Sequence, residues 1–471
     1  MKKILMFLLI TICISSTLFT TQSKALNPFV THIYTADPSA HAFENKIYVY
    51  PSHDQTDPNW FDMVDYHVFS SGDLIQWTDH GVVLDINQVP WKPVKWMWAP
   101  DCAYKNSTYY FYFPASTRTD SSERIPQAND FKIGVATSKS PAGPFIPEPD
   151  AITDSSNPQK YIFGNDPCVF VDTDGQAYMY YGGQGHGAAE YAKWVKLKSN
   201  MKEIDGTPQD ITSGLNYWFE ASYVFKRGNI YYFTYSTGGN AGGFSKIHYA
   251  TSSSPTGPWT YRGKVIDEVK GWTNHQSFVE YPKGSDTWYA FYHSSELSNR
   301  VVNKRSICVD RLYFNSDGTM KPVVQTRTGI GTSAYQRIKA QLFSKQSGIQ
   351  LENIDTSVDV GRYLCWIDNN DWVRYDEIDF GSDGKKVGGF EAGVASAHDG
   401  GVIEIREGDK KGTLLGKVAV PNTGGLQKWE NVTYEISPST VLTGKKDICL
   451  VFKCKKKSTF NLNWFRFIAA N

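Results

Sequence analysis

The sequence predicts an all-β protein made of a five-bladed β-propeller followed by a β-sandwich of the jelly-roll type. Three observations lead to this prediction. Helical periodicity is almost absent, whereas short strands bounded by turn residues fill most of the chain. One strand pattern, rich in aromatic residues, recurs five times. Beyond about residue 325 this pattern gives way to shorter strands of alternating character.

The first residues have the form of a secretory signal. Lys2 and Lys3 precede an apolar run at residues 4–14, and a polar stretch then ends at Ala25. The run is too short to span a bilayer, and small residues near Ala25 suit cleavage. We therefore expect residues 1–25 to be removed and the mature protein to be secreted, either outside the cell or into a periplasm.

Residues 26–325 are predicted to form the propeller. Each repeat is a polar turn followed by an aromatic strand, and the copies begin at Asn45, Asn106, Gly175, Gly228 and Asp286. Their spacing is roughly fifty to seventy residues, which suits units of several strands. A second repeat, ATSKSPAGPF at 136–145, returns two units later as ATSSSPTGPW at 250–259. A pair of sandwiches is the alternative, but it does not explain this two-unit spacing.

Residues 335–471 are predicted to form the sandwich. Strands such as GVIEIRE at 401–407 and DICLVFKC at 447–454 alternate with turns near every ten residues. The Thr- and Gly-rich stretch 326–334 is the expected linker between the two domains. This part of the chain carries no copy of the aromatic repeat, so we expect an independent fold.

Charge and composition narrow the class of partner. The chain has 48 Lys and Arg against 48 Asp and Glu, and loss of Lys2, Lys3 and Lys24 leaves 45 against 48. This balance argues against a nucleic-acid or anionic-membrane partner, because both need a concentrated basic surface. The 28 Tyr, 26 Phe and 14 Trp are typical of carbohydrate-active proteins, in which sugar rings stack on aromatic planes, but also of large β proteins in general.

The six cysteines beyond the signal are scattered and include no CxxC pair. Their spacing argues against a zinc site and against a disulfide framework. Most of them lie inside apolar strands. We therefore expect small buried thiols.

Three acids occupy similar places ahead of the aromatic repeats. Asp37 and Asp166 are each followed by proline, and Glu220 lies in WFEAS; they precede the first, third and fourth repeats. In a propeller the innermost strand of each blade starts at one mouth of the channel, so these side chains should converge there. The prolines should hold Asp37 and Asp166 in an extended conformation.

Converging carboxylates repel one another, so their pKa values spread apart. One of them can then stay protonated near neutral pH while another acts as a base, which is the equipment for glycoside hydrolysis. A single Asp-Pro pair is more simply explained by turn capping. Three acids at the same place in successive repeats indicate a site.

The chain also resembles a known family. The motifs TADPSAHAF, MWAPDC, GNDPCVF, WFEAS and NKRSICVDRL, in this order over residues 27–325, resemble those of glycoside hydrolase family 43. The resemblance implies that Asp37 is the general base, Glu220 the general acid and Asp166 the acid that tunes pKa and orients. It also implies inversion of configuration, with a water between base and sugar and carboxylates about 6.5–9.5 Å apart.

The same resemblance implies further site residues. Arg305 should touch the sugar and the catalytic carboxylates, and Trp98 should form a wall of the pocket, with core packing as its alternative. His275 should face the channel axis, where members of the family often hold calcium with water; a hydrogen-bonded core histidine is the alternative. Three other histidines follow aromatic strands and are weaker candidates for the pocket: His53, His186 and His293.

The C-terminal part resembles a family 6 carbohydrate-binding module. The resembling stretches are YQRIKAQLF, CWIDNNDW, the segment 400–432 and FNLNWFRF. They imply that Trp366 and Trp429 sandwich a sugar and that Asn461 hydrogen-bonds it, with core packing as the alternative for Trp366 and Trp372.

The family's structural calcium position maps to Gln341, Glu404 and Asn463. Two of these residues are amides where carboxylates are common, so less negative charge faces an ion. We therefore expect a weaker calcium site there.

These features together predict a secreted, inverting, exo-acting glycosidase of arabinoxylan or xylan. We expect a monomer that releases L-arabinofuranose, D-xylose or both, with α-L-arabinofuranosidase activity ahead of β-xylosidase activity. One alternative is a fructan-acting propeller hydrolase that retains configuration, but those enzymes carry an NDPNG-like stretch where this chain has ADPSA. The other is a non-catalytic lectin, which needs neither a third acid nor Arg305 in register.

Overall fold

The structure is a computed structural model, and it describes residues 27–470 apart from several short segments. The segments left out are 56–59, 75–76, 118–130, 154–163, 185–190, 328, 331–332, 336, 357–358, 382–385, 399–400, 437–440 and 455–458. The predicted signal at 1–25 and His186 lie outside the described residues.

All regular elements of the described residues are strands, except two short 3-10 helices, η1 (Ile86–Gln88) and η3 (Ala340–Leu342). The predicted all-β class is confirmed. Within the same residues no helix has the length and apolar character needed to cross a membrane.

The first domain contains five antiparallel sheets that follow one another in the chain. The first three comprise β1 (Tyr34–Phe43), β2 (Lys46–Asp54), β3 (Asp65–Ser71) and β4 (Thr78–Asp85); β5 (Asp101–Lys105), β6 (Thr108–Ser116), β7 (Phe131–Ser138) and β8 (Ile146–Pro147); and β9 (Cys168–Val171), β10 (Ala177–Tyr181), β11 (Lys193–Leu197) and β12 (Ile204–Asp210). The last two comprise β13 (Glu220–Arg227), β14 (Ile230–Ser236), β15 (Ile247–Ser252) and β16 (Thr260–Ile266); and β17 (Gln276–Glu280), β18 (Trp288–Ser294) and β19 (Ser306–Leu312).

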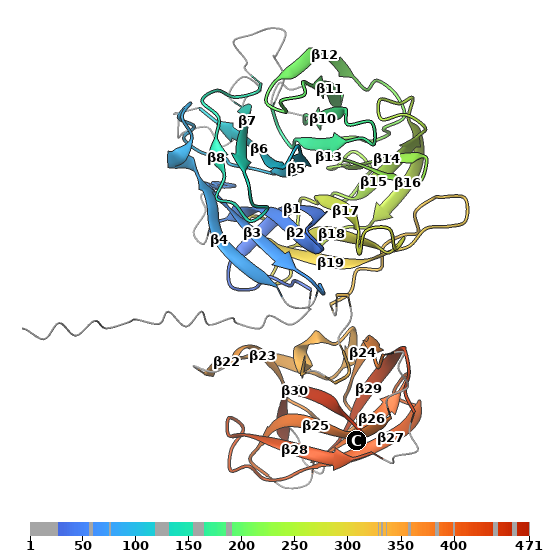
Figure 1. The fold of residues 1–471 in the computed structure, drawn as a ribbon. Coiled ribbons are helices and arrows are strands. Elements are labelled where there is room, and N and C mark those ends of the chain that lie inside the picture. The colour runs from blue at the N-terminus through green and yellow to red at the C-terminus, as the bar shows by residue number, and fades with distance from the viewer. Residues whose placement is uncertain are drawn as a thin grey trace, which may run out of the picture.

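The first strands of the five sheets meet at a common centre (Figure 1). β1 contacts β5 and β17, β9 contacts β5 and β13, and β13 contacts β17, so the contacts run in a ring. The start of every first strand therefore lies close to the start of its neighbours. This arrangement lets residues far apart in the sequence share one site.

Each aromatic repeat forms the second strand of a sheet, namely β2, β6, β10, β14 and β18. Both faces of such a strand are buried, because the sheet packs between two neighbours. On β2, for example, Tyr48 and Tyr50 pack against the second sheet, while Ile47 and Val49 pack against the fifth. The repeat seen in the sequence is thus the apolar layer that joins successive sheets.

The second domain is a sandwich of two sheets, as predicted. One has the order β22 (Gln350–Thr356), β23 (Asp359–Cys365), β30 (Phe460–Ala469), β25 (Val387–Ser396) and β28 (Trp429–Glu435), with β20 (Ile338–Lys339) beside β30. The other has the order β21 (Lys345–Ser347), β24 (Trp372–Asp379), β29 (Lys445–Cys454), β26 (Gly401–Glu407) and β27 (Thr413–Val420). Their facing side chains form one apolar core.

The predicted linker 326–334 forms hydrogen bonds to the first domain at one end and to the sandwich at the other. The hydroxyl of Thr326 donates to Asp310 of the first domain at 2.5 Å, and the amide of Ala334 donates to the carbonyl of Asp379 in the sandwich at 2.8 Å. The domain limits 26–325 and 335–471 themselves stay predictions.

All six cysteines of the described residues are free, and five are buried, with Cys454 half-buried. This confirms the expectation of thiols without disulfides.

Candidate active site

Six residues singled out from the sequence line one pocket of the first domain. They are Asp37, Trp98, Asp166, Glu220, His275 and Arg305. Asp37 and Glu220 lie on the first strands of their sheets, β1 and β13. The other four lie in the loops that lead into β5, β9, β17 and β19, so all five sheets contribute to the pocket. The predicted convergence of the three acids on one site is therefore what the structure contains.

The backbone at the acids differs from the prediction. Asp37 and Asp166 have φ of 49° and 45°, in the left-handed region, so the expected extended conformation was wrong. The register of β1 against β2 shifts between Ala36 and Ser39, which places Asp37 and Pro38 in a β-bulge. Pro38 suits a bulge because it has no amide hydrogen to give to the ladder. Asp37 also lies inside β1 rather than at its start.

The bulge frees the backbone amide of Asp37 for a hydrogen bond outside the sheet. Its amide is released from the strand ladder and donates to Nδ1 of His293 at 3.1 Å. A residue in a sparsely populated backbone region costs of order 1–3 kcal/mol and persists only where its surroundings hold it. Here the surroundings are the buried groups that bond Asp37 from three sides.

Glu220 is held by a similar device. It is the first residue of β13, and the register against β14 shifts between Glu220 and Tyr223. Ala221 has φ of 59°, and its amide donates to Oδ2 of Asp166 at 2.9 Å. The bulge that aims Glu220 therefore also ties it to Asp166.

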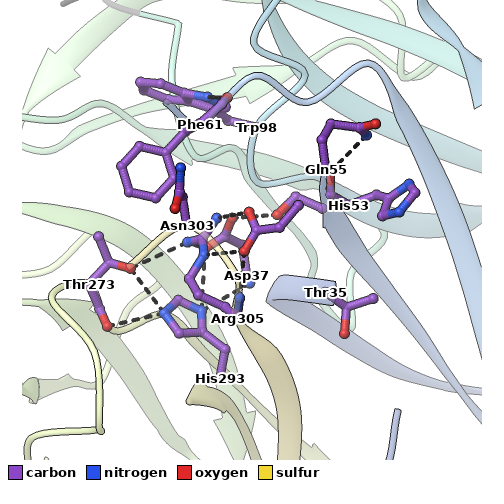
Figure 2. Close-up of polar contacts among 12 residues, drawn as sticks. Thr35, Asp37, His53, Gln55, Phe61, Trp98, Thr273, His293, Asn303 and Arg305 are labelled. Atoms are coloured by element: carbon purple, nitrogen blue, oxygen red, sulfur yellow. Dashed lines mark hydrogen bonds and ion pairs between the residues drawn. The ribbon is translucent and has the colours of Figure 1, made fainter. Parts of the chain in front are cut away.

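Arg305 clamps two carboxylates (Figure 2). Its Nε and Nη2 donate to the two oxygens of Asp54 at 2.9 and 2.8 Å, and its Nη1 donates to Oδ1 of Asp37 at 2.9 Å. Ser52 donates to the other oxygen of Asp37 at 2.5 Å. Since Arg305 is only 3% exposed, this is a buried, charge-assisted network rather than a surface ion pair.

The local electrostatics give Asp37 and Glu220 very different pKa values. Burial alone would raise the pKa of Asp37, but the Arg305 charge, the nearby His275 and His293 and the Ser52 hydrogen bond lower it to about 2. Asp37 is therefore ionised over the whole physiological range. An ionised carboxylate is able to accept a proton from water.

Glu220 has the opposite character. Burial and the negative charge of Asp37 raise its pKa to about 7, although Arg305 opposes the shift. Burial and the charges of Glu220 and Asp37 also raise the pKa of Asp166. The Glu220–Asp166 pair therefore keeps a proton near neutral pH, because two neighbouring buried carboxylates do not both ionise easily.

Two neutral histidines lie close to Asp37, with their Nδ1 atoms 3.7 Å (His275) and 3.4 Å (His293) from its Oδ1. Burial lowers the pKa of His275 to about 4 and that of His293 to about 3. His293 accepts the Asp37 amide at Nδ1, so its hydrogen is on Nε2, which donates to the carbonyl of Thr273 at 3.1 Å. His293 thus supports the site from below, whereas His53 points away from it (Figure 2).

The predicted cation position at His275 has few carboxylates around it among the described residues. Calcium takes six to eight oxygen ligands. Among the described residues the one carboxylate within ion-pair range of His275 is Asp37, 3.7 Å away, and both of its oxygens already accept hydrogen bonds from Arg305 and Ser52. A cation there needs water for its other ligands and stays a prediction.

Aromatic rings form the walls of the pocket. Trp98 is half-buried, and its Nε1 donates to the carbonyl of Phe61 at 2.9 Å, which fixes the ring at the wall. The pure core-packing alternative for Trp98 is excluded. Phe61 lies under the guanidinium of Arg305 at 5.0 Å, and Trp272 at the rim is 49% exposed.

Sequence reasoning missed two acids of this region. Asp54 is the last residue of β2 and has no spacing signal, and only the fold brings it to Arg305. Asp101 stands in the MWAPDC motif and opens β5, but its oxygens accept from Ser39 at 2.5 Å and from the amide of Val169 at 2.5 Å. Asp101 thus joins the first strands of three sheets, and it does not line the pocket.

The sugar-binding residues predicted in the sandwich lie near one another. Trp366 is 54% exposed, so core packing is excluded for it, and its Nε1 donates to Glu352 at 3.1 Å. Tyr363 donates to the other oxygen of Glu352 at 2.6 Å and packs edge-on against Trp429 at 5.2 Å. Asn461 is buried and donates to a backbone carbonyl of the loop before β28 at 2.7 Å. We call these residues the aromatic site of the sandwich.

The predicted calcium ligand Glu404 is engaged elsewhere. One of its oxygens contacts Lys417 at 3.0 Å, and the other contacts Arg406 at 2.8 Å and Lys453 at 4.0 Å. Three cations surround this carboxylate, which is 6% exposed, and a metal ion would have to compete with them for it. A calcium site at Gln341, Glu404 and Asn463 stays a prediction.

Comparison with known proteins agrees with this geometry. Residues 25–320 match the family model described as glycosyl hydrolases family 43. The chain belongs to glycoside hydrolase family 43. It is accordingly a glycoside hydrolase, as the sequence predicted. Residues 339–469 match the model for carbohydrate binding module (family 6), which confirms the resemblance seen in the sandwich.

Relatives of this family 43 enzyme fall into two groups by coverage. A xylosidase/arabinosidase from Humicola insolens is 38% identical over 351 residues, covering 63% of this chain and 99% of its own length. An arabinoxylan arabinofuranohydrolase from Bacillus subtilis is 29% identical over 503 residues, covering 94% of this chain and 92% of its own. The second relative therefore spans both domains.

Solved structures give the same division. A family 43 β-xylosidase/α-arabinofuranosidase from a compost metagenome, in complex with xylotriose, has a TM-score of 0.55 at 39% identity and covers 64% of this chain and 98% of that one. The arabinoxylan arabinofuranohydrolase of Bacillus subtilis, in complex with cellotetraose, has a TM-score of 0.53 at 27% identity and covers 96% and 99%.

Proposed function

We propose that the protein is an inverting exo-glycosidase that removes pentose units from arabinoxylan and xylan-derived chains. The observation that carries this proposal is the pairing, in one aromatic pocket, of an ionised Asp37 with a Glu220 whose pKa is raised to about 7. In this reading the five sheets of the first domain are the blades of a five-bladed propeller. The pocket lies where their first strands begin.

The two acids divide the chemistry between them. Asp37 takes a proton from a water molecule that attacks the anomeric carbon, while Glu220 gives its proton to the departing glycosidic oxygen. The anomeric carbon is thereby inverted in one displacement. Arg305 holds Asp37 ionised and aimed, and Asp166 holds Glu220 through the Ala221 amide.

The pocket suits a terminal sugar. It encloses about 140 Å³, which is small beside the usual range of about 300–1,000 Å³ for ligand sites. A single pentose fits such a space better than the middle of a polysaccharide. The walls made by Trp98 and Phe61 offer apolar faces to the sugar ring, while the charged groups lie at the base.

We place α-L-arabinofuranosidase activity first and β-xylosidase activity second. The relative that spans both domains is named an arabinoxylan arabinofuranohydrolase, which favours arabinose side chains as the target. Relatives that cover the first domain alone are named for both xylose and arabinose. The two pentoses present similar hydroxyl arrangements, so one pocket is able to accept both.

The sandwich is proposed to hold the polysaccharide and the signal to direct the enzyme out of the cell. The exposed ring of Trp366 beside Trp429 suits stacking on xylose units. Residues 1–25 support secretion through their basic, apolar and small-residue pattern. Calcium at His275, completed by water, is part of the same proposal.

The test is a product analysis on an aryl α-L-arabinofuranoside, an aryl β-xyloside and arabinoxylan. We expect the free pentose as first product and, by proton NMR at early times, the anomer opposite to that of the substrate. Retention of the anomer would support the fructan-type retaining mechanism instead. Binding of xylan without sugar release from any of the three would support a lectin.

A further inference from the structure

A cluster of histidines and carboxylates lies on the first sheet, outside the pocket. His53 is near the end of β2, and Asp65 and His67 begin β3. One potential metal-ligand atom from each lies within 4.8 Å of the other two, and no other trio of His, Cys, Asp or Glu among the described residues meets this condition. The rings of His53 and His67 are 5.0 Å apart and nearly perpendicular.

A second carboxylate orients His67. Its Nδ1 donates to Asp79 on β4 at 2.9 Å, so the hydrogen is on Nδ1 and Nε2 carries the free lone pair. Asp79 also contacts His32 at 2.7 Å. A histidine that binds a metal through one ring nitrogen almost always donates the other to a carboxylate or carbonyl. His67 already has this outer partner.

We propose that His53, Asp65 and His67 bind a divalent transition-metal ion, with zinc as the best-suited ion and water as the fourth ligand. Two imidazoles and one carboxylate are the donor set of open zinc sites. Calcium is a poor candidate here because it takes six to eight oxygen ligands. The site is separate from the groups assigned to sugar cleavage.

The local geometry needs only a small adjustment. Nδ1 of His53 and Oδ1 of Asp65 are 2.6 Å apart, at hydrogen-bond distance. Two ligands of a tetrahedral ion with bonds of about 2.0 Å lie about 3.3 Å apart, so the two side chains separate by well under one ångström. Binding of the ion through Nδ1 of His53 moves the single hydrogen of the neutral ring to Nε2, so the ligand is the neutral imidazole. All three side chains are 12–16% exposed, which leaves a path for entry and for the water ligand.

The site is coupled to the pocket through β2. His53 points away from Asp37, while its neighbours Ser52 and Asp54 on the opposite face bond Asp37 and Arg305. An ion at His53 therefore fixes the strand end that supports the catalytic base. It makes no contact with the sugar.

The experiment is a metal titration of the full-length protein. The protein is stripped with chelator, returned to calcium-containing buffer so that any calcium site is filled, and titrated with Co²⁺ and then Zn²⁺. We expect the visible absorption of a low-coordinate Co²⁺ site, one equivalent displaced by Zn²⁺, and a melting temperature that rises with Zn²⁺ concentration.

Substitutions test which residues bind the Zn²⁺ ion. His67→Gln and Asp65→Asn should each weaken Zn²⁺ binding by at least a hundredfold and abolish the rise in melting temperature. Asp79→Asn, which alters only the outer partner, should weaken it about 10–100-fold. His80→Gln is the matched control, because His80 belongs to the same sheet but bonds Ser70 rather than a carboxylate. It should bind Zn²⁺ as the native protein does.

Three outcomes would overturn the proposal. They are the absence of a one-to-one Zn²⁺ site, a site that persists in both His67→Gln and Asp65→Asn, and a site lost in His275→Gln instead. If His67→Gln does not fold, Asp65→Asn decides, because it keeps the shape of the side chain. In each case the His–Asp contacts would be a hydrogen-bonded link between strands and nothing more.

Discussion

The acid pocket of the first domain and the aromatic site of the sandwich are built in opposite ways. In the pocket, Asp37 is 6% exposed and held by Arg305, Ser52 and the backbone bulge. In the sandwich, Trp366 is 54% exposed and makes one side-chain hydrogen bond to Glu352. A buried charge is stable only when hydrogen-bond and ion-pair partners surround it. An exposed aromatic ring is able to bind a sugar with few supporting contacts. A substitution in the pocket should therefore affect both stability and activity, whereas a substitution of Trp366 should affect only sugar binding.

The largest effect should come from the catalytic acids. Glu220→Ala should reduce hydrolysis of arabinoxylan by about 10²–10⁴-fold, because the sugar hydroxyl leaves poorly without a proton. The same variant should keep much more of its activity on an aryl glycoside with an acidic phenol. Asp37→Ala should lose activity on both substrates about equally, because water must be activated in every turnover. Steady-state kinetics on the two substrates measures the contrast.

Azide provides the control for these two variants. It attacks without a base, so it should restore turnover to Asp37→Ala and give a glycosyl azide of inverted configuration. Equal losses in Glu220→Ala on good and poor leaving groups would contradict the division of roles. Asp166 would then be the next candidate for the acid, since its pKa is raised by burial and by the charges of Glu220 and Asp37.

The second effect compares two bidentate arginine–aspartate pairs. Asp54→Asn leaves the buried Arg305 with an incomplete partner and should cost about 3–5 kcal/mol of unfolding free energy. Asp286→Asn breaks the same kind of pair with Arg227, but Asp286 is 59% exposed, and the cost should be about 0–1 kcal/mol. Urea unfolding measures both. Similar costs for the two variants would mean that burial does not set the strength of the clamp.

The third effect is on pH dependence. Glu220 acts as an acid only while protonated, so kcat/KM should fall tenfold per unit as pH rises above about 7. Asp37 acts as a base only while ionised, and its pKa of about 2 means that its loss begins only in strong acid. The alkaline limb should vanish in Glu220→Ala assayed with an acidic phenol. A limb that persists in that variant would belong to another group.

The sequence predicted the three acids of the pocket but not their backbone conformation. Asp37, Asp166 and Glu220 were found because they recur ahead of the aromatic strands, and the repeat reflects the packing of one sheet on the next. Proline after Asp37 predicted an extended residue, whereas the bulge between Ala36 and Ser39 holds it at positive φ. A bulge depends on pairing with another strand, so a local rule does not reveal it.

Partners supplied by distant strands were equally hidden. Asp54 meets Arg305 across 251 positions of sequence, and nothing near Asp54 marks it. The surroundings of Glu404 were hidden in the same way, because Lys417 and Lys453, which contact its carboxylate, lie on neighbouring strands. Residue type at a matched position indicates chemistry only when the surrounding charges agree.

The smallest effect should come from the aromatic site, and it separates two tryptophans. Trp366→Ala should weaken retention on xylan by about tenfold, or about 1.4 kcal/mol, and leave sandwich stability and turnover of aryl glycosides unchanged. Trp429→Ala should remove most xylan binding and also destabilise the sandwich, because its ring packs on Tyr363, which in turn bonds Glu352. Affinity electrophoresis in xylan gels and thermal unfolding measure the two quantities. Trp372→Ala, in the other sheet, is the control for binding. If Trp366→Ala destabilised the sandwich as much as Trp429→Ala, the exposed ring would contribute to the fold. The contrast between the tightly supported acid pocket and the lightly supported aromatic site would then not hold.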